Sequence, residues 1–503
     1  MTLRPSNPTL ANSSLVMTLF LGASMVLRYV FLVAGSWLLA PNEYGLLGVS
    51  LAILTIGGLI FSPFPWALTK YTSENKGNVA FKSVLMSNAV LAIAFVAIIV
   101  AGYSTGVLHI ETKYRLVVLL VVITTAISAI GGIYEGALRG LLRFRELGLV
   151  RVIDQALILC GLAFVLAGWG VSGALLGLTI AFSVATLLLW YFCRDARLTS
   201  GGRWWEPSVH AYGWPMLVGG ASAYLLMNLD IIGLKVWGGE GADAMAGQYQ
   251  AIQVLARMPL IIVLGTVLEA YFSFIARNAG DKVKVEAYVN RMIRYGLIFC
   301  VPIALVIAIV PRQLLGALFP PAYASAAPAL SILAIGTFLL VFDFILSRTL
   351  QAAVGPGAPA VTLLGAAALQ IGLLYLLTPR YGLMGAASST AIASFAALLG
   401  LGRTYLRHHA ITLPWRALGA LAAASACLAV LLVFLPMTNI AALMGGLLVG
   451  ALLFFAVLTA LRGIVQEDVD MVLSGMLGSQ SKIRAGVVRL VRVLNRAPSV
   501  ADA

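Results

Sequence analysis

Charged residues are scarce in this chain, and only 10% of its 503 residues are Asp, Glu, Lys or Arg. Hydrophobic residues occupy 61% of the positions, which is more apolar surface than the interior of a soluble domain can bury. Cysteines and histidines are also few, four of each, and they lack the spacing of a disulfide framework or a zinc site. We therefore exclude a soluble globular protein and expect no cofactor and no metal.

The chain also lacks a long polar segment. The longest stretch between apolar runs, about residues 194–211, is too short to fold as a catalytic or nucleotide-binding domain. No GxxxxGK[ST] motif occurs, so we expect no ATP hydrolysis by this chain. A polytopic sugar polymerase or ligase is a weak rival, because such enzymes typically carry a large catalytic outer loop. We expect that the protein is not an enzyme.

Long apolar runs are abundant, and windows of about 20 residues predict transmembrane helices. The fold class is all-α, a polytopic integral membrane protein with about 14 transmembrane helices. They are expected roughly at 15–39, 44–68, 84–107, 115–138, 150–168, 171–193, 212–236, 246–275, 293–311, 326–347, 358–378, 383–402, 416–436 and 440–461.

The net charge is +14, and the basic residues that produce it are concentrated in loops predicted to lie on one side of the membrane. Of the 33 Lys and Arg residues, 26 fall in the two termini and every second loop, whereas 4 fall in the opposite loops. The positive-inside rule then places both termini in the cytoplasm, and no nucleic-acid partner is needed to explain the charge. The basic tail at 463–503 has an apolar face and would lie on anionic lipid; an ordinary solubilising tail is the alternative.

The chain contains an internal repeat. The stretch from Gly170 to Ala174 recurs 212 residues later, from Gly382 to Ala386. Weaker matches in the same order pair Tyr44 with Tyr249, Asn75 with Asn278, and 137–140 with 349–352. Six spans per repeat predict two lobes related by a pseudo-two-fold axis along the membrane normal. We expect lobes at residues 1–200 and 201–410, accessory helices at 411–462 and a cytoplasmic tail at 463–503.

Arg28 lies alone near the middle of the first apolar run. A guanidinium at mid-bilayer costs on the order of 2.5–3.5 kcal/mol even on the mildest insertion scale, so it indicates a functional need for positive charge. The alternative is pairing with a carboxylate of a neighbouring helix. With an offset near 202 residues, Arg28 aligns with Asp230, which would place opposite charges across a cavity between the lobes.

Several short motifs follow one another in an order that resembles a known family. They are Gly-Ala-Leu-Arg-Gly at 136–140 running into Arg143-Phe144-Arg145, then Asn228-Leu229-Asp230, Gly247-Gln248-Tyr249, Phe319 to Tyr323, and the two Gly-x-x-Gly-Ala openings. Over residues 10–460 the chain resembles the multidrug/oligosaccharidyl-lipid/polysaccharide superfamily. The likeness is greatest to its polysaccharide-transporter branch, the Wzx-type flippases of O-antigen and exopolysaccharide repeat units.

This resemblance implies an alternating-access transporter in the bacterial inner membrane. It would flip polyprenyl-(pyro)phosphate-linked oligosaccharides for surface polysaccharide synthesis, with membrane lipids, a polymerase and glycosyltransferases as partners. The related lipid II flippases carry cavity-facing arginines in spans 1 and 8, and the residues of that kind here are Arg28 and Arg257. An arginine at 257 would alternatively only neutralise Asp230. Guanidinium groups suit a pyrophosphate because they donate bidentate hydrogen bonds.

Other charged residues complete the candidate site. Asp230 and Lys235 in the seventh span are candidates for substrate binding. Coupling to H⁺ or Na⁺ would use a further carboxylate, and the candidates are Asp154, Glu269 and Asp343. Local compensation is the plainer alternative for two of them, since Arg151 precedes Asp154 and Arg348 follows Asp343.

A cluster of arginines, Arg139, Arg143 and Arg145, would capture the anionic headgroup on the cytoplasmic side, or simply signal topology. Glu135 with Arg139 has the i,i+4 spacing of a structural ion pair. The main rival function is a cation-coupled multidrug or metabolite antiporter of the same superfamily.

Overall fold

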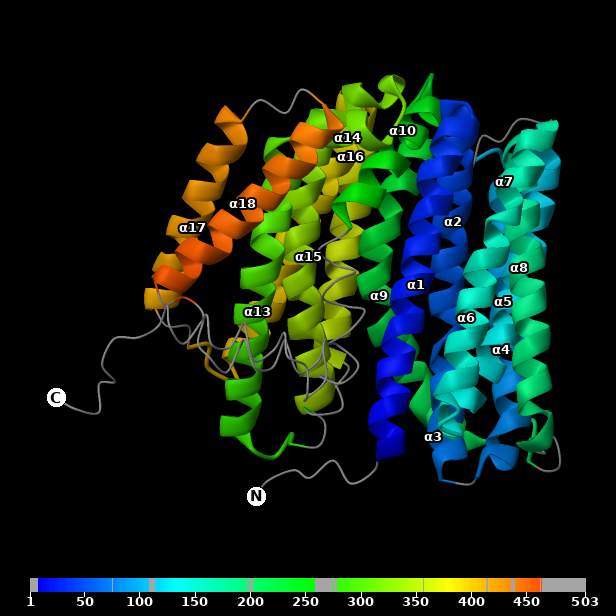
Figure 1. Cartoon of the computed structure of the whole chain (residues 1–503). Helices are drawn as coiled ribbons and strands as arrows, with labels where there is room; N and C mark the ends of the chain where they lie inside the picture. Colours follow the sequence, from blue (N-terminus) through cyan, green and yellow to red (C-terminus); the bar gives the residue numbers. More distant parts are fainter. Residues whose placement is uncertain are drawn as a thin grey trace.

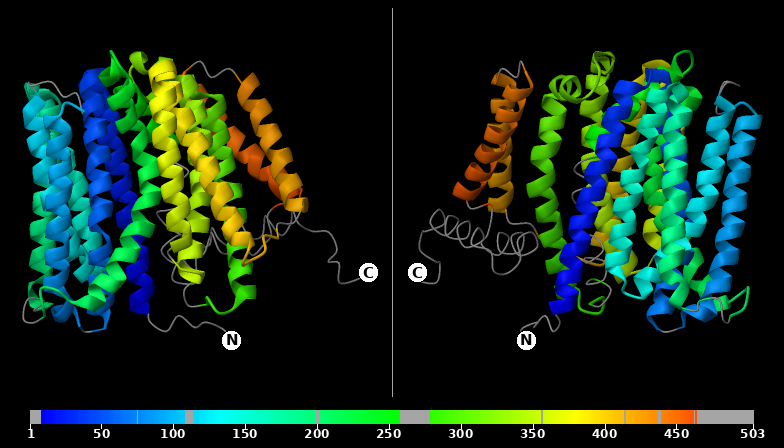
Figure 2. Two further views of the ribbon diagram at one scale, coloured as in Figure 1. Left: turned by 180° about the vertical axis from the view of Figure 1, so that it is seen from behind. Right: turned by 45° about the vertical axis from the view of Figure 1, so that its right-hand side comes forward.

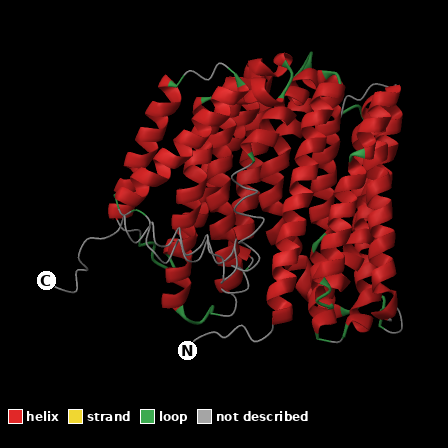
Figure 3. Ribbon diagram, viewed as in Figure 1, coloured by secondary structure: helices red, strands yellow, loops and turns green. Residues whose placement is uncertain are grey.

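The computed structural model describes residues 8–74, 76–107, 114–196, 198, 202–257, 275, 278–355, 357–412, 415–435, 439–461 and 463. Within these residues the protein is helical and contains no strand (Figure 3). An N-terminal group holds α1 (Pro8–Leu38), α2 (Pro41–Phe61), α3 (Pro63–Ser73), α4 (Gly77–Ser104), α5 (Arg115–Gly140), α6 (Phe144–Ile158), α7 (Cys160–Phe164) and α8 (Gly170–Cys193). A C-terminal group holds α9 (Pro207–Trp237), α10 (Ala242–Ala256), α13 (Lys282–Ile309), α14 (Pro311–Leu318), α15 (Ala327–Ala353) and α16 (Gly357–Leu406).

Two further helices, α17 (Trp415–Phe434) and α18 (Ile440–Ala460), stand tilted beside α13 at the edge of the bundle (Figure 1). The N-terminal group occupies the other side of the molecule, and α1 and α9 run between the two groups in both Figure 1 and Figure 2. We call the end of the bundle at which α1 is followed by α2 the upper end, and the opposite end the lower end.

The helices have the length and composition of membrane spans. Nine helical segments among the described residues are long and apolar enough to cross a membrane. Two of these, Phe144–Ala196 with 53 residues and Pro359–Leu406 with 48, are each long enough to cross twice. Each predicted span coincides with helix in the described residues, while 258–274 of the eighth lies outside them. The prediction of an all-α polytopic membrane protein is confirmed.

Each of the two long segments reverses direction at a glycine, and these two glycines occupy equivalent positions in the internal repeat. Gly170 and Gly382 have φ values of +51° and +53°, which side chains of L-residues rarely adopt. Three residues later, Gly173 and Gly385 pack against the backbone of the preceding arm, at Phe164 and Leu377 respectively. The two Gly-x-x-Gly motifs thus build the same hairpin, because one glycine turns the chain and the other lets the two arms meet. The boundaries of the four predicted segments, two lobes, the accessory helices and the tail, stay predictions.

Substitution of Gly382 by alanine is expected to destabilise the α16 hairpin. A Cβ at this positive φ introduces backbone strain of about 1–3 kcal/mol. The unfolding midpoint of the purified protein in detergent should therefore fall. Gly402→Ala in the same helix is the matched control, because a Cβ there meets no atom within 4 Å. Equal midpoints for the two variants would contradict the strained turn.

The largest buried core joins the two groups at their upper end. One large cluster contains residues of both, including Leu47 and Val121 from the N-terminal group and Ile252 and Leu330 from the C-terminal group. A second cluster consists of C-terminal-group residues with Ile275. A third surrounds Phe64 and Leu138 in the N-terminal group and includes Val209 from the first turn of α9. The groups therefore share a large core above, whereas below the start of α9 packs into the N-terminal core and the rest of the C-terminal group has a core of its own.

Glycines bring α2 and α10 into contact at this upper end. A Cβ on Gly45 would lie 2.6 Å from the Gly247 backbone nitrogen, and one on Gly247 would overlap the Pro41 carbonyl oxygen. The two glycines are 202 residues apart, which is the offset that aligns the first spans of the two repeats. Equivalent positions therefore touch each other, as they must where a pseudo-two-fold axis passes.

Polar and aromatic contacts reinforce the upper junction. Trp37 Nε1 donates to the Leu318 carbonyl oxygen at 2.9 Å, and Gln248 Nε2 donates to the Ala322 carbonyl oxygen at 3.0 Å. The rings of Tyr44 and Tyr323 meet edge to face with centroids 5.9 Å apart. These contacts tie α1, α2 and α10 to the α14 region, so the upper end is closed in this structure.

Candidate functional site

A cavity of about 130 Å³ lies beneath the α2–α10 contact. Four helices surround it, with α1 and α2 from the N-terminal group and α9 and α10 from the C-terminal group. Its lining residues are Arg28, Tyr29, Leu32, Gly48, Leu51, Ala52, Thr55, Asn228, Gln250, Gln253, Val254 and Arg257. We call this the central cavity. Both arginines predicted as substrate ligands line it, and no carboxylate does among the described residues.

Arg28 is exposed on the central cavity although it lies deep within an apolar helix. Within the part of the chain that the structure describes, its guanidinium makes no hydrogen bond and no ion pair. The nearest acidic influence is Asp154 on α6, whose charge acts on Arg28. The alternative of a tight pair with a neighbouring carboxylate is therefore not what this structure shows. The guanidinium is available to a ligand.

Arg257 lies at the cavity directly after the last residue of α10, Ala256. Its guanidinium donates to the Met227 carbonyl oxygen of α9, and its charge acts on buried Asp230. Gln250 and Gln253 precede it at helical spacing, so the three side chains form a polar stripe along one face of α10. The stripe gives the cavity amide groups that both donate and accept hydrogen bonds.

Asp230 lies behind the cavity wall and is fully occupied by hydrogen bonds. Its Oδ1 accepts from Gln253 Nε2 at 2.7 Å and from the Ile231 backbone N–H at 2.9 Å. Its Oδ2 accepts from the Tyr249 hydroxyl at 2.9 Å and from Thr390 Oγ1 at 3.2 Å.

The expectation that Arg28 faces Asp230 needs correction, because the arginine whose charge acts on Asp230 is Arg257. Alignment through the repeat assigned the wrong partner, because α10 contacts α9 directly whereas α1 packs chiefly on α6.

The other predicted site residues lie away from the central cavity. Buried Lys235 forms an ion pair with Asp243, which joins the end of α9 to the start of α10. Asp343 is buried in α15, and neither carboxylate oxygen has a hydrogen-bond partner among the described residues. Arg348 does not compensate it, since Arg348 Nη1 donates to Gln351 Oε1 instead. Glu269 lies outside the described residues.

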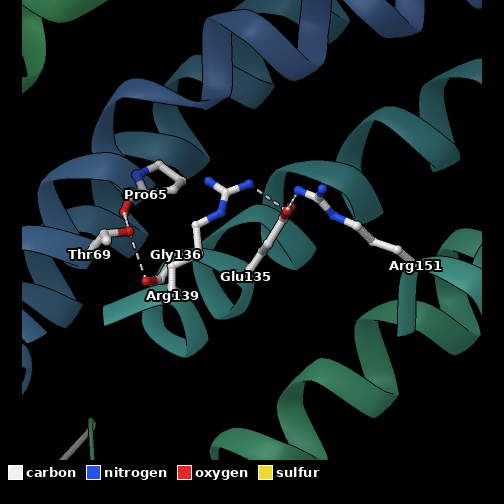
Figure 4. A network of polar contacts seen from close by, with 6 residues as sticks. All are labelled: Pro65, Thr69, Glu135, Gly136, Arg139 and Arg151. Carbon is white, nitrogen blue, oxygen red and sulfur yellow. Dashed lines mark hydrogen bonds and ion pairs between the residues drawn. The ribbon is translucent and has the colours of Figure 1, made fainter. Parts of the chain in front are cut away.

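A second, larger cavity of about 350 Å³ lies inside the N-terminal group, between α2, α3, α5, α6 and α8. We call it the lateral cavity. Glu135 Oε1 accepts from Arg139 Nη2 at 2.5 Å and from Arg151 Nη2 at 2.6 Å, so one carboxylate holds two guanidiniums (Figure 4). The predicted Glu135–Arg139 pair is thereby confirmed. The Arg139 guanidinium also lies 4.6 Å from the centre of the Trp66 ring.

The predicted headgroup-capture cluster divides into three environments. Arg139 faces the lateral cavity, where it contacts Glu135 and Trp66. Arg143 Nη1 donates to the Phe192 carbonyl oxygen at 2.5 Å and so ties the α5–α6 turn to α8. Arg145 is exposed at the start of α6. A role in capture stays a prediction for all three.

Sequence reasoning overlooked several residues of the cavities. Tyr29 and Thr55 left no pattern, because single polar residues in apolar runs are common. Asn228 was noted only as part of the Asn228-Leu229-Asp230 motif and not as a cavity residue. The stripe at 250, 253 and 257 did have a detectable signal, since spacings of three and four place polar residues on one helical face. The pairing of Glu135 with two arginines left no detectable signal in the sequence, since Arg151 lies on a different helix from Glu135.

A bundle of membrane-length helices with a polar cavity between two groups is an architecture that membrane transporters share. Comparison with solved structures agrees. The lipid II flippase MurJ in an inward closed conformation is similar with a TM-score of 0.71 and 13% identity, covering 92% of this chain and 100% of that chain. An inward-facing multidrug resistance MATE family transporter is similar with a TM-score of 0.61 and 14% identity, covering 78% of this chain and 94% of that chain. At these identities the likeness shows the fold alone.

Sequence comparison gives the family. The family described as "Polysaccharide biosynthesis protein" matches residues 36–328, more than half of the chain. The protein belongs to this family, and it has the fold of MurJ and of the MATE family transporters. A relative in Methanocaldococcus jannaschii, described as uncharacterized membrane protein MJ1068, is 29% identical over 199 residues. That match covers 37% of this chain and 37% of the relative.

Proposed function

We propose that the protein flips polyprenyl-(pyro)phosphate-linked oligosaccharides across the bacterial inner membrane for surface polysaccharide synthesis. The observation that carries this proposal is the pair of arginines, Arg28 and Arg257, lining one cavity between two helical groups. A cavity of about 130 Å³ has room for roughly four waters at about 30 Å³ each, or for a phosphate group that displaces them. Its charge would offset that of the anionic headgroup while the polyprenyl chain stays in lipid.

Alternating access is supported by the large core at the closed upper end and by the lower end, where the two groups share only the smaller core that contains Phe64 and Val209. In our proposal the lower end and both termini face the cytoplasm, as the distribution of Lys and Arg predicts. A headgroup would reach the arginines from below, and the α2–α10 contact would then open above it. A polymerase and glycosyltransferases would act on either side of this step.

Coupling to H⁺ or Na⁺ is a further part of the proposal. Asp343 is a strong candidate, because a buried carboxylate without partners among the described residues is costly when charged. Protonation or a bound cation would remove that cost. Asp154 and Glu269 remain the other candidates.

The decisive experiment uses liposomes containing the purified protein and a fluorescent polyprenyl-pyrophosphate-linked oligosaccharide. Flippase activity predicts that an added reducing agent quenches nearly all of the fluorophore, instead of only the outer-leaflet half. Protein-free liposomes are the control. Gradient-dependent export of a cationic dye, with no movement of the lipid, would instead support the rival antiporter.

A further inference from the structure

The lateral cavity has no role in the phosphate binding proposed for the central cavity. We propose that it binds a sugar of the lipid-linked substrate while the central cavity binds the phosphate. This inference rests on the proposed flippase function and deepens it by assigning the two parts of the substrate to two adjoining sites.

The first support is position along α2. Thr55 lines the central cavity and Gly58 lines the lateral cavity, and these residues are about 4.5 Å apart along the helix axis. The charges of Arg28 in one cavity and Asp154 in the other also act on each other. A group covalently attached to a phosphate at Arg28 would therefore reach the lateral cavity.

The second support is charge. The described lining of the central cavity includes two arginines and no carboxylate, which favours an anion. The lateral cavity balances Arg139 and Arg151 with Glu135 and Asp154, so its formal charge is zero. Both guanidiniums are directed to Glu135, as Figure 4 shows. Such a lining does not attract a free anion, but it presents donors and acceptors for a neutral polyhydroxylated ligand.

The third support is an acceptor without a donor. Asp154 Oδ2 accepts from Gln155 Nε2 at 2.8 Å, whereas its Oδ1 is buried with no partner among the described residues. A buried acceptor left unpaired is unfavourable. Because Asp154 lines the lateral cavity, we assign a sugar hydroxyl as the donor that this carboxylate lacks. The cavity volume of about 350 Å³ also falls in the range of about 300–1,000 Å³ that small-molecule sites occupy.

The test fills the lateral cavity from Gly58. A Cβ at this position meets no atom within 4 Å, so leucine would project into open space without displacing the backbone. Binding to purified protein in nanodiscs is measured for two probes: polyprenyl pyrophosphate, and the same lipid carrying one N-acetylglucosamine. We expect Gly58→Leu to weaken binding of the sugar-bearing lipid about tenfold, which is about 1.4 kcal/mol, and binding of the bare lipid less than about twofold.

The matched control is Gly372→Leu in α16, where a Cβ also meets nothing within 4 Å and no described cavity is lined. A second variant, Asp154→Asn, keeps the side-chain shape and removes one acceptor. It should weaken binding of the sugar-bearing lipid by about fivefold and leave binding of the bare lipid unchanged. It serves as the test if Gly58→Leu fails to fold.

The outcomes separate the two proposals. Equal weakening of both probes would show that the lateral cavity extends the phosphate site, and no effect on either would show a water-filled space; each result overturns the sugar site. Failure of the unmodified protein to bind either probe would instead overturn the proposed flippase function.

Discussion

Replacement of Gly247 by alanine is expected to hold the upper ends of the two helical groups apart. The added Cβ would overlap the Pro41 carbonyl oxygen at the α2–α10 contact, and a rigid backbone cannot yield as a side chain can. Overpacking of this kind costs about 1–3 kcal/mol. The balance between closed and open upper ends should then shift toward open by about fivefold to more than a hundredfold.

Two measurements check this expectation. Spin labels at Ser104 and Arg312, exposed residues at the upper ends of the two groups, should report longer distances in Gly247→Ala. Flipping in liposomes should fall at the same time, because the transporter cannot return to the state that is open below. Gly372→Ala, whose Cβ touches nothing within 4 Å, should change neither. Unaltered label distances in Gly247→Ala would show that the α2–α10 contact does not control closure.

Removal of the charge at Arg28 is expected to have the second large effect. Each hydrogen bond from a charged group contributes about 1.5–3 kcal/mol, so Arg28→Gln should weaken binding of polyprenyl pyrophosphate by about tenfold to more than a hundredfold. The affinity of Arg28→Lys should lie between those of the unmodified protein and Arg28→Gln, since an ammonium keeps the charge but loses the bidentate geometry.

Arg28 is the sharper test of the two cavity arginines because it makes no hydrogen bond within the described structure, whereas Arg257 also bonds Met227. Binding is measured by titration in nanodiscs, with Arg312→Gln on the exposed surface of α14 as the control. Affinity in Arg28→Gln equal to that of the unmodified protein would falsify the proposed phosphate site.

The membrane spans were predictable because each depends on residues that are neighbours in the chain. A window of about 20 apolar residues is a helix wherever it lies in a bilayer, since only internal hydrogen bonds can satisfy its backbone there. The glycine hairpins at Gly170 and Gly382 were equally visible as a repeated motif. Their positive φ explains why glycine stands at both positions.

Partner choice was less predictable. Arg28 and Arg257 were expected in one cavity, and the structure brings them together there. The pairing of Arg28 with Asp230 was wrong, because it depended on which helices pack closely, and an offset within a repeat does not specify that. Compensation of Asp343 by Arg348 was the plainer alternative to ion coupling, yet Arg348 donates to Gln351 and Asp343 has no hydrogen-bond partner among the described residues.

The chain by itself determined that this is a helical membrane protein with an internal repeat, and that a guanidinium lies deep within an apolar segment. Hydropathy, charge and glycine spacing are local properties, so they can be read along the chain. Only the tertiary structure decided that α2 and α10 meet at Gly45 and Gly247, that one glutamate holds two arginines, and that two cavities adjoin along α2. Each of these depends on the distance between helices far apart in sequence, which packing sets.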